Sequence, residues 1–203
     1  MKRAGIAAAA VVGVGLLVAA AAAIRAFDHR AEVATALPRP QRGGPFTLVT
    51  TDGTTVTDRT YRGKILLVYF GYTLCPDICP TTLGAIAEAM TALGRNADRV
   101  QPLFITIDPR RDTPKVLADF VGNFGPRLIG LTGTPQQIAA VAKEYDVIYA
   151  AHAAKDAPDG YLMDHTALVY VMDPEGRFVA TFNPETSVDQ MVDRLSKLIA
   201  PTD

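Results

Sequence analysis

The stretch ILLVYFGYTLCPDICP, residues 65–80, joins an unbroken apolar run to a pair of cysteines. Residues 65–70 carry no charged side chain, a pattern typical of a strand that is buried on both faces of a sheet. Cys75 and Cys79 follow this strand directly, and a helix is expected from about residue 82. In open α/β sheets, binding sites form at the carboxyl ends of the strands. The two cysteines therefore lie where a functional site is expected.

Strands and helices alternate on both sides of this stretch. Further strands are expected at 46–50, 54–57, 100–107, 128–131, 166–172 and 177–182, and further helices are expected to begin at Thr113-Pro114, at Thr134-Pro135 and near Val188. Turn residues 51–53 and 173–176 make hairpins of the first and last strand pairs. Residues 150–163 are expected to form a long loop. The order predicts an α/β domain with a central, mostly parallel sheet and helices on both faces.

The N-terminus predicts a membrane attachment. Lys2 and Arg3 precede Ile6 to Ile24, a run without charged or polar side chains that is close to the length needed to cross a bilayer. An uncleaved anchor at residues 1–31 is favoured over a cleaved signal peptide. The proline and glycine content of residues 32–45 indicates a linker to a domain at 46–203. We therefore expect a single-pass inner-membrane protein whose domain faces the periplasm.

The bulk charge excludes one class of function. The formal net charge of the 203-residue chain is −1, without the strong basic balance that nucleic-acid-binding domains usually show. No nucleic-acid partner is expected.

The cysteine pair is a poor candidate for a structural disulfide. A bond between Cys75 and Cys79 would close a very short loop, worth roughly 2 kcal/mol by chain entropy, against about 4.7 kcal/mol for a 100-residue loop. Two chemistries remain open, which are thiol–disulfide exchange and the binding of a soft metal such as Cu(I) or Zn(II). Pro76 and Pro80 disfavour helical conformation in the residues before them, so both cysteines are expected on an extended loop.

A metal site needs a third ligand, and the chain has three histidines. His29 lies beside the apolar N-terminal run, and His152 lies in the expected loop. Taken alone, His165 fits a structural role as well as a ligand role. Its position at the start of strand 166–172, which should lie near strand 65–70, favours it as the ligand, and a Cys₂His set suits trigonal Cu(I).

Two neighbours of His165 are weaker candidates. Asp164 could orient the imidazole, although adjacent strand residues face opposite sides. Met163 is a soft donor, but a packing role is favoured for it.

Separate motifs give the chain a family resemblance. These are Cys-Pro-Asp-Ile-Cys-Pro at 75–80, Asp-Pro-Arg-Arg-Asp-Thr-Pro at 108–114, Asp164-His165, and Asp173-Pro174, with 44–48 and 62–64 matching the start of the pattern. Over about residues 42–200 the sequence resembles the Sco/SenC family.

The resemblance implies a thioredoxin-like fold with an inserted hairpin and one copper ion held by Cys75, Cys79 and His165, with Asp77 beside it as a modulator. It implies a copper metallochaperone, a binding protein rather than an enzyme, that assists assembly of the dinuclear copper centre in subunit II of cytochrome c oxidase. An upstream copper donor is then a second partner. The alternative is a thiol–disulfide oxidoreductase that keeps the cysteines of that subunit reduced.

A third function, a peroxidase of the peroxiredoxin type, is disfavoured. It would arrange Thr73 and either Arg110 or Arg111 around one peroxidatic cysteine, and a loop with paired cysteines fits that arrangement poorly.

Overall fold

The computed structural model describes residues 42–199. The predicted anchor at 1–31 and most of the predicted linker lie outside the described residues. No helix within 42–199 combines the length and the apolar character needed to cross a membrane.

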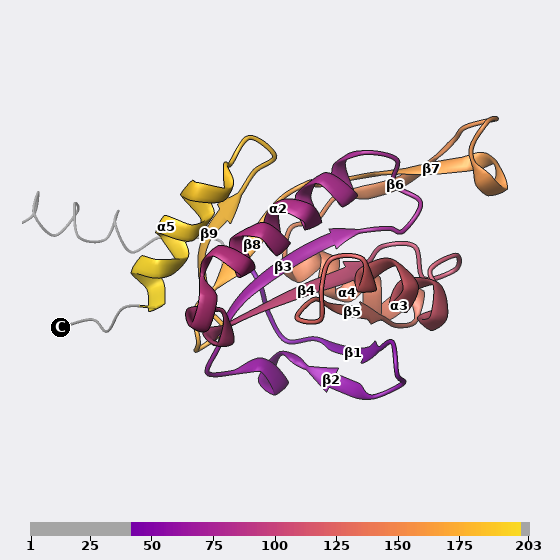
Figure 1. Ribbon diagram of the computed structural model, residues 1–203. Helices are drawn as coiled ribbons and strands as arrows, with labels where there is room; N and C mark the ends of the chain where they lie inside the picture. The colour runs from indigo at the N-terminus through magenta and orange to yellow at the C-terminus, as the bar shows by residue number, and fades with distance from the viewer. Residues whose placement is uncertain (1–41, 200–203) are drawn as a thin grey trace, which may run out of the picture. The chain divides into compact units, whose positions relative to one another are not determined.

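A seven-stranded sheet forms the centre of the domain, in the order β2-β1-β5-β4-β3-β8-β9 (Figure 1). Its strands are β1 Thr47–Thr50, β2 Thr55–Thr57, β3 Ile65–Gly71, β4 Val100–Thr106, β5 Ile129–Thr132, β8 Val169–Met172 and β9 Phe178–Phe182. β3 pairs parallel with β4, and β4 with β5, whereas the other four pairs are antiparallel. The α/β class is thus confirmed, but the sheet is mixed rather than mostly parallel, because a hairpin extends it at each edge.

The helices fall on both faces of the sheet, as predicted. They are α2 Ile78–Ala92, α3 Pro114–Gly122, α4 Pro135–Glu144 and α5 Val188–Ile199, with short 3₁₀ turns η1 Asp58–Tyr61, η2 Gly94–Arg99 and η3 Pro158–Gly160. The predicted caps are present, since the hydroxyls of Thr113 and Thr134 accept hydrogen bonds from backbone N–H groups of the first turns of α3 and α4.

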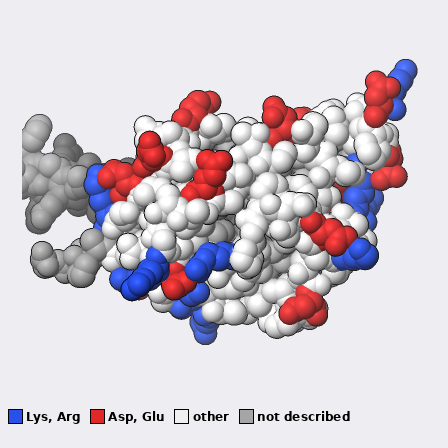
Figure 2. All heavy atoms as spheres, viewed as in Figure 1, with Lys and Arg blue, Asp and Glu red and all other residues white. Residues whose placement is uncertain are grey.

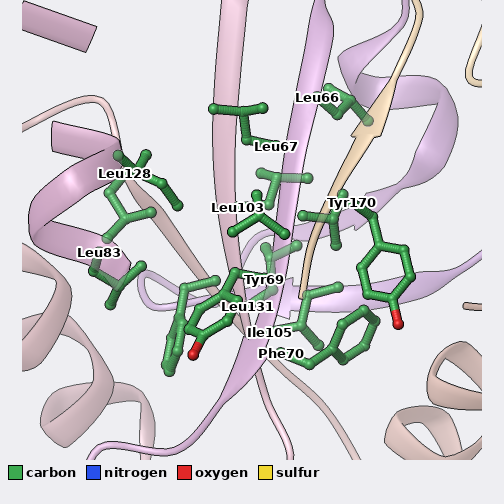
Figure 3. Close-up of a cluster of buried hydrophobic side chains, with 14 of the residues drawn as sticks. Leu66, Leu67, Tyr69, Phe70, Leu83, Leu103, Ile105, Leu128, Leu131 and Tyr170 are labelled. Atoms are coloured by element: carbon green, nitrogen blue, oxygen red, sulfur yellow. The ribbon is translucent and has the colours of Figure 1, made fainter. Parts of the chain in front are cut away.

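Alternation along β3 assigns the helices to their faces. Tyr69 reaches Cys79 of α2, and its neighbour Phe104 packs on Phe120 of α3. Phe70 points to the other side, where it meets Tyr145, directly after α4, and also Tyr170. Figure 3 shows Tyr69 on the side of Leu83 and Phe70 on the side of Tyr170. Every residue of β3 is buried, as expected for a strand covered on both faces.

A separate two-stranded sheet projects from this body (Figure 1). β6 Tyr149–Ala153 pairs antiparallel with β7 Tyr161–His165, and charged residues at the tip are exposed (Figure 2). This is the inserted hairpin that the resemblance implies. The predicted long loop at 150–163 is therefore wrong, because β6 is an exposed, alanine-rich strand without the apolar alternation that marks a half-buried one. The prediction that His165 opens strand 166–172 is also wrong, since His165 ends β7 and β8 begins at Val169.

The last residues of the predicted linker pack on the domain. The N–H of Gly43 donates to the carbonyl of Glu144 at 2.6 Å, and the Arg42 guanidinium lies 3.5 Å from the Asp146 carboxylate. Gly43 has φ +87°, and a Cβ there would meet the side chain of Met172. The ordered fold thus begins before residue 46.

Candidate metal centre

Three metal-binding side chains converge at the carboxyl end of β3. Cys75 Sγ, Cys79 Sγ and a ring nitrogen of His165 lie within 4.8 Å of one another. Cys79 Sγ is 3.4 Å from His165 Nε2. Both cysteines are buried and unbonded to each other, and His165 is half-buried. The sequence predicted these three residues as one site, and the fold brings them together.

The local backbone of the second cysteine differs from the prediction. Cys75 lies in the loop after β3, as expected, but α2 begins at Ile78 and places Cys79 in its first turn. The expectation of an extended loop at both cysteines is therefore wrong for Cys79. Pro80 is compatible with this early start, because the first N–H groups of a helix have no intrahelical partner for a proline to remove.

Two residues of β3 shape the surroundings of Cys79. A Cβ on Gly71 would lie 2.6 Å from Cys79 Sγ and 2.8 Å from the Phe104 ring, so the glycine leaves the space that the thiol occupies. The buried Tyr69 hydroxyl donates to Cys79 Sγ at 3.8 Å. Sequence reasoning missed Tyr69, although its position two residues before Gly71 places it on the same face of the strand.

The two thiols differ in their acidity. The pKa of Cys75 is lowered from 9.0 to about 4, mainly because the Cys79 thiol donates a hydrogen bond to it; burial opposes this, and His165 and the backbone N–H groups of Cys79 and Asp77 assist. The pKa of Cys79 is raised by the same shared hydrogen bond, by burial and by the charge of Cys75. The shared hydrogen bond thus favours the thiolate at Cys75 and the protonated thiol at Cys79.

The surroundings of His165 orient it by aromatic contacts. The rings of Tyr69 and Tyr72 meet it edge-on, with centroids at 6.1 and 6.0 Å. Its Nδ1 lies 3.3 Å from the carbonyl oxygen of Thr166, which leaves Nε2 facing Cys79.

Among the predicted auxiliary residues, Asp164 lies differently from expectation. Asp164 is exposed and its carboxylate lies 3.2 Å from Nδ1 of His152, so it does not orient His165; the two residues are adjacent on β7 and face opposite sides. Asp77 is exposed at the N-cap position of α2, where its carboxylate accepts a 3.4 Å hydrogen bond from Thr81. Met163 is partly buried and packs against the core, in line with the packing role.

Asp112 holds the loop that leads to the cysteines. Its buried carboxylate accepts hydrogen bonds from the Thr73 N–H at 3.1 Å, the Thr73 hydroxyl at 2.6 Å and the Thr106 hydroxyl at 2.5 Å. Burial raises the pKa of Asp112, although these hydrogen bonds oppose the rise. The sequence showed Asp112 only as part of a family motif, because its bonding partners are distant in the chain.

Known proteins share this fold and sequence pattern. The family model SCO1/SenC matches residues 34–200. The chain is 38% identical to Protein sco1 of Schizosaccharomyces pombe over 79% of this chain and 62% of that protein, so it spans less than two thirds of that relative.

Solved structures extend the comparison. The structure of Bradyrhizobium japonicum ScoI with copper bound is 44% identical and has a TM-score of 0.72, over 77% of this chain and 99% of that one. BsSco, described as a member of the Sco family of cytochrome c oxidase assembly proteins, is 23% identical with a TM-score of 0.60, over 78% of this chain and 94% of that one, and shares the fold. The extent of the family match and the shared thioredoxin-like fold establish that the chain belongs to the SCO1/SenC family.

Proposed function

We propose that this protein binds one copper ion through Cys75, Cys79 and His165 and supplies it for assembly of the dinuclear copper centre in subunit II of cytochrome c oxidase. The convergence of two sulfur donors and one imidazole within 4.8 Å carries the proposal. Two thiolates and an imidazole match the softness of Cu(I). Copper in a 44% identical Sco structure supports the choice of metal, and the description of the Sco family as cytochrome c oxidase assembly proteins supports the oxidase role.

A Cu(I) titration of the reduced full-length chain in detergent, in competition with a Cu(I) chelator, tests the binding. We expect one ion per chain, no tight binding by Cys75→Ser or Cys79→Ser, and affinity lowered by roughly 10-fold or more in His165→Ala. The matched control is His152→Ala, since His152 lies on the same hairpin but contacts Asp164 instead of the site. Equal losses in the two histidine variants, or absence of copper binding, would refute the proposal.

The acidity of the thiols favours a second candidate function, reduction of the disulfide of that same subunit. The Cys75 thiolate would attack one target sulfur, forming a mixed disulfide and releasing the other target sulfur as a thiolate. Cys79 would then lose its proton to the released target thiolate and attack Cys75 Sγ, which breaks the mixed disulfide and releases the target sulfur that was bound to Cys75. The target ends as a dithiol and this protein as a Cys75–Cys79 disulfide. The lowered pKa of Cys75 supports this reading, since the thiolate is the nucleophile.

His165→Ala separates the two functions. The variant keeps both cysteines, so disulfide reduction would continue while copper transfer to the reduced subunit fails. The assay mixes the variant with the isolated copper domain of subunit II, once oxidised and once reduced and metal-free. Loss of both activities would reject the reductase function, and unimpaired copper transfer would reject the chaperone function.

The redox state of the pair would also control metal loading. A Cys75–Cys79 disulfide has no thiolate to offer, so the oxidised protein should release copper.

We further propose the attachment suggested by residues 1–31, a single span in the inner membrane with the domain in the periplasm, and an upstream protein that donates the copper. Protease accessibility of the domain in intact spheroplasts tests this orientation.

A further inference from the structure

Strand pairing does not set the distance between His165 and the cysteines. His165 ends β7, and β7 pairs only with β6 among the strands of residues 42–199. The next chain segment joins the central sheet at Val169, which pairs with Tyr69 of β3. The projecting hairpin therefore needs another connection to the body for His165 to lie opposite the thiols.

Arg111 makes that connection on the hairpin side. Its Nη1 donates to the carbonyl oxygens of Pro158 and Tyr161, at 3.0 and 2.9 Å. Its guanidinium also stacks over the Tyr161 ring, 3.6 Å from the centroid. These contacts hold the start of β7, the strand that ends in His165.

On the body side, Arg111 is held by Asp108, which follows β4. Arg111 Nε donates to Asp108 Oδ2 at 2.6 Å, and the side chains are 8% and 5% exposed. The Tyr161 hydroxyl donates to the same carboxylate at 3.1 Å. Charged hydrogen bonds shielded from water in this way have a well-defined geometry.

An aromatic contact continues from Arg111 to the metal centre. The guanidinium carbon lies 5.8 Å from the centroid of Tyr72, and the Tyr72 ring meets His165 edge-on at 6.0 Å and 89°. Tyr161, Arg111, Tyr72 and His165 thus follow one another in space.

The remaining space between hairpin and body is incompletely filled. A cavity of about 360 Å³ lies there, with Ile107 and Ile138 on the body side and Tyr149 and Met163 on the hairpin side. Tyr149 and Met163 still pack against the core around this cavity, and the polar contacts of Arg111 add a directional connection beside that apolar packing.

We propose that Arg111 is a positioning residue for His165: anchored on Asp108, it holds β7 and Tyr72 so that the imidazole faces Cys75 and Cys79. The inference deepens the proposed copper function and rests on it for the metal. Its geometric part concerns the metal-free protein and can be tested alone.

The test compares Arg111→Gln with Arg110→Gln in the full-length chain in detergent. Arg110 is the exposed neighbour, so its replacement removes the same charge outside the connection. Since Arg111→Gln leaves Asp108 buried without its partner, the double variant Asp108→Asn/Arg111→Gln is included as a second test that leaves no unpaired buried charge.

The first measurement uses reduced, metal-free protein with labelled histidines. The ring-proton NMR signals of His165, assigned with His165→Ala, should be shifted by the ring currents of Tyr69 and Tyr72, whose centroids lie 6.1 and 6.0 Å away. We expect these signals to move toward the values of a free histidine in Arg111→Gln and in the double variant, and to stay unchanged in Arg110→Gln. Thermal unfolding measured alongside reports whether each variant is folded.

The second measurement uses Cu(I)-loaded protein. X-ray absorption should show the nitrogen ligand diminished in both Arg111 variants, with the two sulfur ligands retained. Affinity should fall roughly 10- to 100-fold, against less than about twofold for Arg110→Gln.

Unmoved His165 signals and an intact nitrogen ligand in the folded double variant would overturn the positioning role. If the wild type shows no nitrogen ligand, or one that His165→Ala does not remove, the proposed copper site is overturned instead. The NMR comparison would still decide whether Arg111 positions the ring.

Discussion

Gly71 ends β3 at the point where the strand comes closest to Cys79. A methyl group at this position would overlap the thiol and the Phe104 ring, both within 2.8 Å of it. We expect Gly71→Ala to lower the free energy of unfolding by about 1–3 kcal/mol, because overpacking forces neighbouring groups to shift. We also expect it to weaken Cu(I) binding by displacing Cys79. Urea unfolding and chelator competition measure the two effects.

Gly84 provides the matched control for that substitution. It lies within α2, and a Cβ there would meet nothing within 4 Å. Gly84→Ala should stabilise the protein by about 0.5–1 kcal/mol, since alanine is the better helix former, and leave copper affinity unchanged. If the free energy of unfolding of Gly71→Ala fell by no more than the amount by which Gly84→Ala changes it, the steric explanation would be contradicted.

A second prediction about a single residue concerns the acidity of the Cys75 thiol. Its pKa of about 4 means that the thiolate is present above that pH and is lost below it. The thiolate absorbance at 240 nm of the reduced, metal-free protein should persist at pH 6 and fall between about pH 5 and pH 3. His165→Ala should move this transition upward, because it removes a hydrogen bond that stabilises the thiolate.

Cys75→Ser serves as the baseline, since the transition should vanish in it. A single titration near the ordinary thiol pKa in the wild type would show that the hydrogen bonds around Cys75 do not stabilise its thiolate.

At the scale of elements, the connection between β3 and α2 depends on Asp112. Asp112→Asn places an amide group where three donors now point at a carboxylate. We expect a loss of about 1–3 kcal/mol in the free energy of unfolding, because buried donors lose their acceptor. Urea denaturation measures it. Asp119→Asn on the exposed face of α3, 68% exposed, should change stability by less than about 0.5 kcal/mol. Similar effects of the two substitutions would contradict the role assigned to Asp112.

The sequence predicted most of the central elements, and particular residues explain where it did not. The buried run of β3 and the Thr-Pro starts of α3 and α4 are local signals and were located correctly. The hairpin β6–β7 has no such signal, because β6 is largely exposed, β7 is mostly partly buried, and the two strands pair only with each other among the strands of residues 42–199. The start of α2 was placed too late, since the proline at position 80 was taken as a boundary although it sits in the first turn.

The candidate site, like the fold, could be predicted only in part from the sequence. The two cysteines are close in sequence and are recognised from their placement after β3, whereas His165 needs the family resemblance because it approaches them from a distant part of the chain. Tyr69, Tyr72 and Asp112 were missed as parts of the site, since their roles depend on which side of a strand or loop they face. The alternation along a strand already weighed against Asp164, and its contact with His152 confirms that it faces away from His165.

At the scale of the whole molecule, a bound ion would link two otherwise separate sheets. Cu(I) at 100 times its dissociation constant should add about 2.7 kcal/mol to the stability of the native state. The unfolding midpoint should then rise by roughly 5–10 °C. Differential scanning calorimetry under reducing conditions measures this shift, and Cys79→Ser should show none.

Hydrogen exchange shows which residues bound copper stabilises. Amides of residues 149–165 should be protected on copper loading, whereas those of β8 and β9, already joined to β3, should change little. Protection spread evenly over the domain, or absent from the hairpin, would contradict a ligand on β7.

The packing of Arg42 and Gly43 has a consequence for how the protein is approached. Gly43 lies against Met172, which pairs with Leu66 near the start of β3, while the thiols follow the other end of that strand. β3 spans roughly 20 Å between these ends. The described chain therefore enters the domain at one pole, and its metal-binding groups lie near the opposite pole. A protein that exchanges copper or electrons with the thiols must therefore approach the domain at the pole opposite Gly43.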